Sequence, residues 1–257
     1  MKGLTALIMV ALLALAGCGG QGGGAGAGPA PDGAPAQDGG GQPDEDVQEE
    51  GDGASMETAT LLYQGHASLR ITTREGKVIY IDPFAGEGYD APADLILVTH
   101  SHPDHTQVDL IENRNPDCQT ITYKEALAGG EHQTFELGYA TVEATEAGNN
   151  KNHDIKECVG FILTLEGGVT VYVSGDTSTT EQMAALAERG IDYAFFCCDG
   201  VYNMDVEEAS ACAALVKAKH SIPYHMAPGE LFSQERAEMF QAEGRLIMAA
   251  GEEIALI

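Results

Sequence analysis

Residues 94–105 constrain the fold of this chain more than any other stretch. The apolar run Leu95-Ile96-Leu97-Val98 precedes His100-Ser101-His102-Pro103-Asp104-His105, which holds three imidazoles and a carboxylate in six residues. The apolar half predicts a strand buried on both faces. The polar half is typical of metal ligands, and it favours two adjacent cations because one tetrahedral ion with an open position needs only about three protein ligands. A polar surface loop is the alternative, disfavoured because only 8 of 257 residues are histidine.

The His-x-His-x-Asp-His pattern of residues 100–105 resembles the signature of the metallo-β-lactamase superfamily. That resemblance implies an α/β fold, a four-layer αβ/βα sandwich with a metal site at one edge of its two sheets. The strand and helix patterns between residues 58 and 257 also predict an α/β layered domain. We therefore expect residues 58–257 to form one domain of this fold.

Two histidines are candidates for the next ligand. His153 lies in the polar loop 148–154, ahead of the apolar strand pattern 158–165, whereas His132 lies within an alternating strand pattern and is expected to face solvent. Binding residues are frequent in loops that strands hold in place. We therefore favour His153.

Asp176 follows the apolar strand pattern 169–173. Gly175 allows a sharp turn there, so that the carboxylate projects at the strand end, where its two oxygens could bridge two cations. Asp176 could also be an acidic residue near the start of a helix that Ser178 and Glu181 cap and that runs to Arg189, but Gly175-Asp176-Thr177 resembles the bridging motif of the superfamily, which favours the ligand role. The two roles are compatible.

His225 closes the Ile222-Pro223-Tyr224-His225 strand end, and His220 lies five residues earlier. A Pro-x-His strand end resembles the closing histidine of the superfamily, so we expect His225 to be a ligand and His220 a structural or surface residue. The resemblance then implies how the ligands are shared. One cation is expected on His100, His102 and His153, the other on Asp104, His105 and His225, with Asp176 bridging them.

Nitrogen and oxygen ligands without thiolate suit two Zn²⁺ ions, and Mn²⁺ or Fe²⁺ as well. His66 and Asp82 resemble the Gly-His and Asp-Pro positions of the superfamily, which orient ligands or touch substrate; each could instead be a hydrogen-bonded turn residue. We expect catalytic roles for His66 and for Asp104, which would hold metal and position the water. Tyr202 and Met204, in the loop 199–204, are our candidates for substrate contact.

Two neighbouring cations would lower the pKa of a shared water to about 7, from roughly 16 in bulk, and so supply hydroxide. The resemblance therefore implies hydrolysis of an ester, lactone or phosphodiester. Four motifs are most similar to hydrolases related to the L-ascorbate phosphate lactonases: Gly65-His66-Ala67, Asp82-Pro83, Gly175-Asp176-Thr177 and residues 222–225.

Three alternatives to this function are open. One is hydrolysis of phospholipids or other phosphodiesters near a membrane. Another is a lipoprotein that binds metal without turnover. β-Lactamase activity is the least favoured, because nothing in the sequence points to antibiotic binding.

The first 57 residues predict export. An apolar run too short to span a bilayer ends in Leu15-Ala16-Gly17-Cys18, which resembles a bacterial lipobox and implies lipid attachment at Cys18. Residues 19–57 are rich in Gly, Pro and acid, which predicts a disordered linker. We expect a protein anchored by lipid to the outer face of the cell membrane, with a small-molecule or lipid substrate; the sequence does not fix its oligomeric state.

The net charge of the expected domain argues against one class of partner. Residues 58–257 hold 31 acidic against 12 basic side chains, a balance of −19 that argues against nucleic acid as a partner.

Of the five cysteines after Cys18, those at 158, 197, 198 and 212 lie in apolar patterns. We expect them to be buried rather than to form a disulfide framework.

Overall fold

The computed structural model describes residues 56–257. The expected signal peptide, Cys18 and all but the last two residues of the expected linker lie outside the described residues. Within the described range, no helix combines the length and hydrophobicity that crossing a membrane requires.

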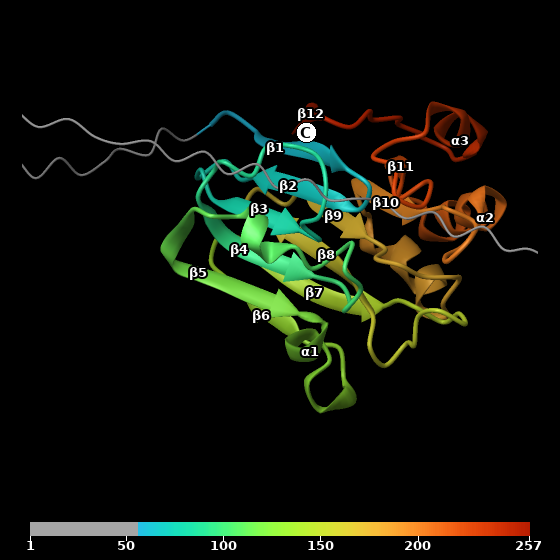
Figure 1. Ribbon diagram of the computed structural model, residues 1–257, viewed down its shortest axis with the longest axis horizontal. Coiled ribbons are helices and arrows are strands. Elements are labelled where there is room, and N and C mark those ends of the chain that lie inside the picture. The colour runs from blue at the N-terminus through green and yellow to red at the C-terminus, as the bar shows by residue number, and fades with distance from the viewer. Residues whose placement is uncertain (1–55) are drawn as a thin grey trace, which may run out of the picture. The chain divides into compact units, whose positions relative to one another are not determined.

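Two six-stranded sheets pack face to face (Figure 1). The first sheet has the order β12 (Glu252–Leu256), β1 (Ala59–Gly65), β2 (Ser68–Thr72), β3 (Val78–Ile81), β4 (Ala93–Val98), β5 (Arg114–Thr122). The second has the order β11 (His220–Tyr224), β10 (Tyr193–Cys197), β9 (Thr170–Val173), β8 (Val159–Leu165), β7 (Ala140–Glu146), β6 (Thr134–Glu136). Counted from β12 or from β6, each sheet shows three antiparallel pairs and then two parallel ones.

β4 confirms the prediction of a strand buried on both faces, since all six of its residues are buried. Leu95 and Leu97 belong to the core between the sheets, whereas Ile96 and Val98 belong to a second cluster on the outer face of the first sheet. This division follows from the period of two along a strand. The absence of polar residues between 95 and 98 is therefore a requirement of the fold.

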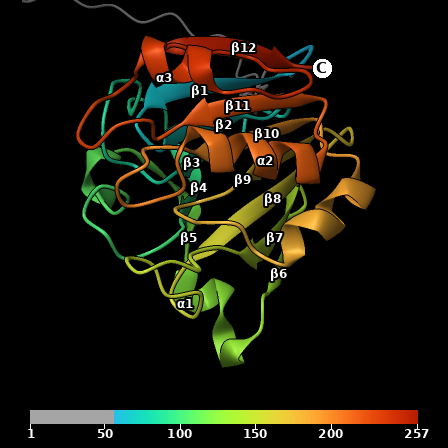
Figure 2. The same ribbon diagram turned by 90° about the vertical axis from the view of Figure 1, so that its right-hand side faces the viewer.

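The two outer layers differ in construction. α2 (Val206–Val216) and a 3₁₀ helix (Gln182–Arg189) cover the outer face of the second sheet (Figure 2). The outer face of the first sheet is covered by the β3–β4 connection, through Tyr89, and by the short 3₁₀ helix Val108–Leu110. The α/β sandwich is thus confirmed, with one outer layer made mostly of loops.

Three shorter elements complete the fold in the described residues: α1 (Tyr123–Ala126), the 3₁₀ turn Ala128–Gly130 and α3 (Gln234–Met239). The expected cap at residues 178–181 is wrong: the helix begins at Gln182, and Glu181 makes no capping bond with its side chain. The amide of Gln182 donates to the Glu146 carboxylate instead, so a partner from another strand takes the place of a local cap.

The parallel strands bring their carboxyl ends to one edge of the two sheets. β3 and β4 run parallel in the first sheet, and β9, β10 and β11 run parallel in the second. Loops at the carboxyl ends of such strands are where α/β proteins build their sites.

The five cysteines of the described range are free, and all but Cys118 are buried, as expected.

Candidate metal centre

Six chain segments supply the polar cluster at this edge. The segment 100–105 follows β4, His153 comes from the β7–β8 connection, and Asp176 and His225 follow β9 and β11. His66 and Asp82 follow β1 and β3. Every predicted metal ligand therefore reaches the cluster from the end of a strand or from the loop before one.

Backbone strain concentrates at this cluster. His66, Asp82 and His225 have φ values of 55°, 47° and 46°, in the left-handed region that residues other than glycine seldom adopt. Hydrogen bonds hold the strained backbone in place: His225 N donates to His66 O at 2.8 Å, and Tyr63 Oη donates to the same carbonyl at 3.0 Å. Strain that the surrounding structure maintains is typical of functional sites.

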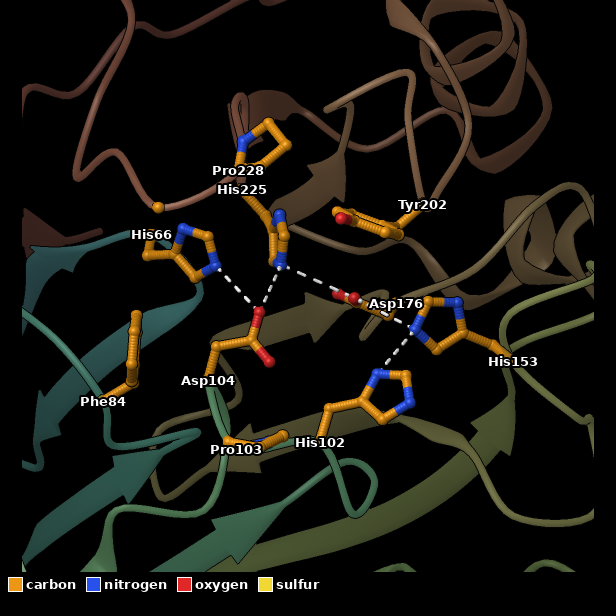
Figure 3. A pocket seen from close by; sticks show the side chains of 11 residues that line it. His66, Phe84, His102, Pro103, Asp104, His153, Asp176, Tyr202, His225 and Pro228 are labelled. Carbon is orange, nitrogen blue, oxygen red and sulfur yellow. Dashed lines mark hydrogen bonds and ion pairs between the residues drawn. The ribbon is translucent and has the colours of Figure 1, made fainter. Parts of the chain in front are cut away.

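Asp176 lies at the centre of the cluster (Figure 3). Its Oδ2 lies 3.3 Å from His153 Nε2 and 3.5 Å from His225 Nε2, and its Oδ1 lies 3.4 Å from His105 Nε2. The carboxylate is 3% exposed. It therefore faces ligands of both predicted cations, as a bridging carboxylate must.

Asp82 orients two of the predicted ligands. Its Oδ2 accepts hydrogen bonds from His105 Nδ1 at 2.8 Å and from Thr99 Oγ1 at 2.7 Å. Because the Thr99 hydroxyl donates to Asp82, it accepts from His100 Nδ1, 3.1 Å away. Both imidazoles are thereby protonated on Nδ1, which leaves the Nε2 lone pairs directed into the site. These contacts fit the orienting role, one of the roles that the resemblance implies for Asp82.

Asn150 and Asn203 contact predicted ligands, Asp199 lies close to a further one, and sequence reasoning missed all three. Asn150 Oδ1 lies 3.2 Å from His153 Nδ1. Asn203 Nδ2 donates to Asp176 Oδ2 at 2.8 Å and to Asp199 Oδ2 at 2.7 Å, and Asp199 Oδ2 lies 3.5 Å from His225 Nδ1. Their positions in the sequence could have indicated these contacts. Asn150 lies in the same loop as His153, and Asp199 lies just beyond the end of the apolar strand β10.

His66 contacts a predicted ligand directly. Its Nδ1 lies 3.1 Å from Glu230 O, a carbonyl that can only accept, so this nitrogen carries a proton. Its Nε2 lies 3.2 Å from Asp104 Oδ2. That contact requires either a proton on Nε2 or a cation held between the two atoms.

Within residues 56–257, three groups of ligand atoms are close enough to share an ion. The first, His100, His102 and His153, coincides with the predicted first set. The other two differ from the predicted second set: His66 joins Asp104 and His225, whereas His105 lies with His100 and Asp176.

Unsatisfied atoms support metal binding at this cluster. The Nε2 atoms of His100, His105 and His225 and the Oδ1 of Asp176 are buried without a hydrogen-bond partner in the described part of the chain. Buried polar groups are almost always paired, so these atoms call for a partner that the protein does not supply. Imidazole nitrogens and carboxylate oxygens fit Zn²⁺, Mn²⁺ or Fe²⁺.

The electrostatics of the cluster reflect buried imidazoles and carboxylates in close contact. Burial works to lower the pKa of His105, but the Asp176 and Asp82 carboxylates outweigh it and raise that pKa well above its usual value. Burial lowers the pKa of His100 to about 2, with a further contribution from His105. Burial works to raise the pKa of Asp176, but the His225 and His105 imidazoles outweigh it and hold that pKa well below its usual value. Burial works to raise the pKa of Asp104, but the His225 imidazole 3.7 Å away and the hydrogen bond with His66 outweigh it and lower that pKa. A neutral imidazole and two ionised carboxylates are the forms that bind a cation.

A cavity of about 370 Å³ opens over the cluster. Tyr202 lines it, with 52% of the side chain exposed, and so does Asp104. Met204 does not: it is 1% exposed, its side chain belongs to the main hydrophobic core, and its amide pairs with Thr177 O. The expectation of substrate contact is thus corrected for Met204.

The two remaining histidines lie away from the cavity. His132 is exposed and does not line it, and the His220 ring stacks on Tyr193 with centroids 4.9 Å apart. His153, in contrast, lines the cavity. The choice of His153 over His132 agrees with this placement.

A family profile, curated relatives and a solved structure all match this chain, and they agree on one family. Residues 60–225 match the profile of the Beta-lactamase superfamily domain. A UPF0173 metal-dependent hydrolase of Geobacillus sp. (strain WCH70) is 31% identical over 64% of this chain and 84% of its own length. Another, from Lysinibacillus sphaericus (strain C3-41), is 30% identical over 76% of this chain and 98% of its own. A solved structure from Parabacteroides distasonis ATCC 8503 superposes with a TM-score of 0.62 at 27% identity, over 74% of this chain and 92% of that one.

Proposed function

This chain belongs to the metallo-β-lactamase superfamily and, within it, to the UPF0173 metal-dependent hydrolases, and from that premise we propose hydrolysis of an ester, lactone or phosphodiester at a site for two divalent cations. Imidazole and carboxylate ligands suit Zn²⁺, the ion we propose, and Mn²⁺ or Fe²⁺ as well, since ligand type alone does not distinguish them. The resemblance to the L-ascorbate phosphate lactonase branch supports a lactone among the substrates.

The observation that carries the proposal is the set of unsatisfied atoms around Asp176. Three imidazole Nε2 atoms and Asp176 Oδ1 are buried without partners in the described residues, and orienting hydrogen bonds direct two of those imidazoles inward. Building such a cluster costs stability unless ions complete it. The arrangement therefore fits a bound metal pair better than a purely structural role.

Divalent cations bound here would supply hydroxide at neutral pH and a Lewis acid for the carbonyl or phosphoryl oxygen. The protein's own residues position the reactants. Asp104 is 35% exposed and lines the cavity, so its carboxylate can accept a hydrogen bond from the attacking water. His66 keeps Asp104 in place through the 3.2 Å contact, and the buried Asp176 lies beneath the same cavity.

The alternative of another class is a lipoprotein that binds cations without turnover. The open cavity argues against it, because purely structural metal sites are closed by protein ligands, whereas catalytic sites keep a position accessible. Measured binding of two ions per chain without turnover of any ester, lactone or phosphodiester would favour the binding protein.

The test compares two histidine substitutions in the full chain. His102→Ala removes a ligand from the group with His100 and His153, whereas His132→Ala removes an exposed histidine that does not line the cavity. Metal content is measured by elemental analysis, together with turnover of an ester, lactone and phosphodiester panel. We expect about two ions per chain in the wild type and in His132→Ala, with loss of metal and turnover in His102→Ala. Equal metal content in all three proteins would refute the site.

Export and anchoring through Cys18 are a separate proposal that rests on residues 15–18. A lipid on this cysteine would hold the domain near membrane substrates, which keeps phospholipid hydrolysis as the main alternative. Mass spectrometry of the N-terminal peptide, from protein made in a bacterial host, tests this proposal. A lipidated Cys18 as the first residue of the mature protein supports the anchor, whereas an uncleaved chain with an unmodified Cys18 contradicts it. Release of lipid head groups by the metal-loaded protein would favour the phospholipid alternative.

A further inference from the structure

The walls of the cavity are apolar above a polar floor. Phe84, Pro103, Tyr202, Pro228 and Gly229 line it together with the polar cluster. Figure 3 shows Phe84 and Tyr202 on opposite sides of the cluster, with Pro103 and Pro228 between them on the other two sides. The part of a substrate that does not react would therefore contact two aromatic rings and two prolines.

No lysine or arginine lines this cavity among the described residues. Lys151 lines a more open depression on the other side of His153, and Arg236 donates its Nη1 to Cys198 O. The surrounding domain carries 31 acidic against 12 basic side chains over residues 58–257. Apart from the two proposed cations at the floor, which the reacting group would occupy, an anionic group elsewhere on the substrate would thus find no cationic side chain in the wall and an excess of acidic side chains in the surrounding domain.

Tyr202 is held firmly although its side chain is exposed. Its amide donates to Asp199 Oδ1 at 2.7 Å, and its carbonyl accepts from Asn152 Nδ2 at 2.8 Å. Its ring has no aromatic partner among the described residues. An aromatic side chain on a fixed backbone loses little entropy when it binds, so such residues are effective contact points for flat apolar groups.

Phe84 is fixed in a similar way. Its amide donates to Ser68 Oγ at 3.0 Å, and its ring lies 5.3 Å from the His66 ring, centroid to centroid. The ring is thus beside the polar floor, where an acyl or leaving group would lie. A cavity of about 370 Å³ is near the lower end of the usual range for ligand pockets, roughly 300–1,000 Å³.

We propose that this site takes small, uncharged carboxylic esters or lactones with an aromatic group, which Tyr202 and Phe84 hold. The proposal rests on the proposed hydrolase function and names its substrate class. In the reaction, the acyl carbon–oxygen bond breaks and the oxygen of one water bonds to the acyl carbon. One proton of that water passes to the leaving oxygen, and the other leaves with ionisation of the product acid.

The first experiment varies substrate charge and keeps the ring. Methyl 4-acetoxybenzoate and 4-acetoxybenzoate carry the same acetyl ester on the same ring, and they differ in a remote group that is neutral in one and anionic in the other. With the zinc-loaded full chain, we expect kcat/KM at least about tenfold higher for the neutral ester. Dihydrocoumarin should exceed δ-valerolactone, and bis(4-nitrophenyl) phosphate should be the poorest substrate.

The second experiment tests the aromatic wall. Stacking is worth about 0.5–1.5 kcal/mol, so Tyr202→Ala should reduce the preference for dihydrocoumarin over δ-valerolactone roughly 2- to 13-fold, and Tyr202→Phe should restore it. Val201→Ala is the matched control, because Val201 is 51% exposed in the same loop but does not line the cavity. Lys151→Ala should leave the ratio of neutral to anionic ester unchanged.

Binding without turnover gives an independent readout. Saturation-transfer NMR with 4-phenyl-2-butanone, an uncharged aromatic ketone, should show contact with the wild type and less with Tyr202→Ala. Equal rates for the neutral and the anionic ester, or a preference for the phosphodiester, would overturn the substrate class and leave the hydrolase standing. No turnover of any ester, lactone or phosphodiester by protein that holds metal would refute the hydrolase, and a ketone that fails to bind would refute the aromatic wall itself.

Discussion

The Asp82 carboxylate and the His105 imidazole form a completely buried pair, with Oδ2 and Nδ1 2.8 Å apart. The same oxygen accepts from Thr99, whose hydroxyl contacts His100. One carboxylate thus fixes two imidazoles that belong to different predicted cations. Disturbing it should affect both ions together.

Asp82→Asn should lower metal affinity about 10- to 100-fold, the usual effect of losing an orienting group of this kind. An amide placed with its NH₂ toward His105 would donate to Nδ1, so that the proton moves to Nε2 and the lone pair for the metal is lost. Competition with a chelating indicator dye measures the affinity. Asp192→Asn is the control, because Asp192 is also a buried aspartate with several hydrogen bonds but lies outside the cluster. Equal affinity in the two variants would contradict the role of Asp82.

The positions of the predicted ligands could be read from the sequence because each has a local signal. His100, Asp176 and His225 each follow an apolar strand, and His153 lies in a polar loop before one. Parallel strands then bring those ends together, a consequence of topology that the alternation of strands and helices already predicts. The same logic predicted the double-sided burial of β4.

The orienting residues could not be predicted in the same way. Asn203 contacts Asp176 across 27 residues, and Asp199 contacts His225 across 26, so each contact depends on how two loops pack. Met204 is buried in a loop whose backbone pairs with Thr177, a contact between two distant segments. The helix that begins at Gln182 likewise has its first amide bound by Glu146 of β7 instead of by the local cap that the sequence predicted. Pairings between distant segments leave no periodic signal in a sequence.

Metal removal should destabilise the fold. Each ion that binds only the folded chain stabilises it by about 2.7 kcal/mol when free metal is 100 times the dissociation constant. For a domain of this size that corresponds to a fall in Tm of roughly 5–10 °C for each ion that the chelator removes. Differential scanning calorimetry with and without EDTA measures the shift, and added Zn²⁺ should reverse it. His102→Ala should respond less than the wild type, whereas an unchanged wild-type Tm after chelation would contradict metal binding.

Asp192 should contribute stability that depends on pH. Burial works to raise its pKa, but hydrogen bonds from Lys219 and Thr170 outweigh burial and lower it. The folded pKa is therefore below the unfolded value of about 3.9, so the contribution is complete above that pH and disappears as pH falls through the folded pKa. Asp192→Asn should cost about 1–3 kcal/mol in the free energy of unfolding at pH 7, and less below about pH 4.

Urea unfolding at pH 7 and at pH 3 measures this difference. The control is Asp117→Asn, since Asp117 is exposed and has no side-chain hydrogen bond among the described residues. Its stability should stay within about 0.5 kcal/mol of the wild type at both pH values. A cost of Asp192→Asn that is the same at both pH values would mean that the carboxylate charge contributes nothing.

Gly175→Ala should damage both stability and metal binding. Gly175 has a φ of 61°, and a Cβ there would lie 2.6 Å from Val159 O, a backbone atom that cannot move away cheaply. Positive φ and overpacking each cost about 1–3 kcal/mol, so we expect a loss of about 2–6 kcal/mol in the free energy of unfolding. Any relief of the clash displaces Asp176, the next residue, from its contacts with His153, His225 and His105, so metal affinity should fall as well. Gly138→Ala separates the two effects, because Gly138 has a φ of 85° but nothing within 4 Å of the added Cβ. It should cost only about 1 kcal/mol and leave metal affinity unchanged; equal losses in the two variants would show that φ alone, and not the contact with Val159, makes glycine necessary before Asp176.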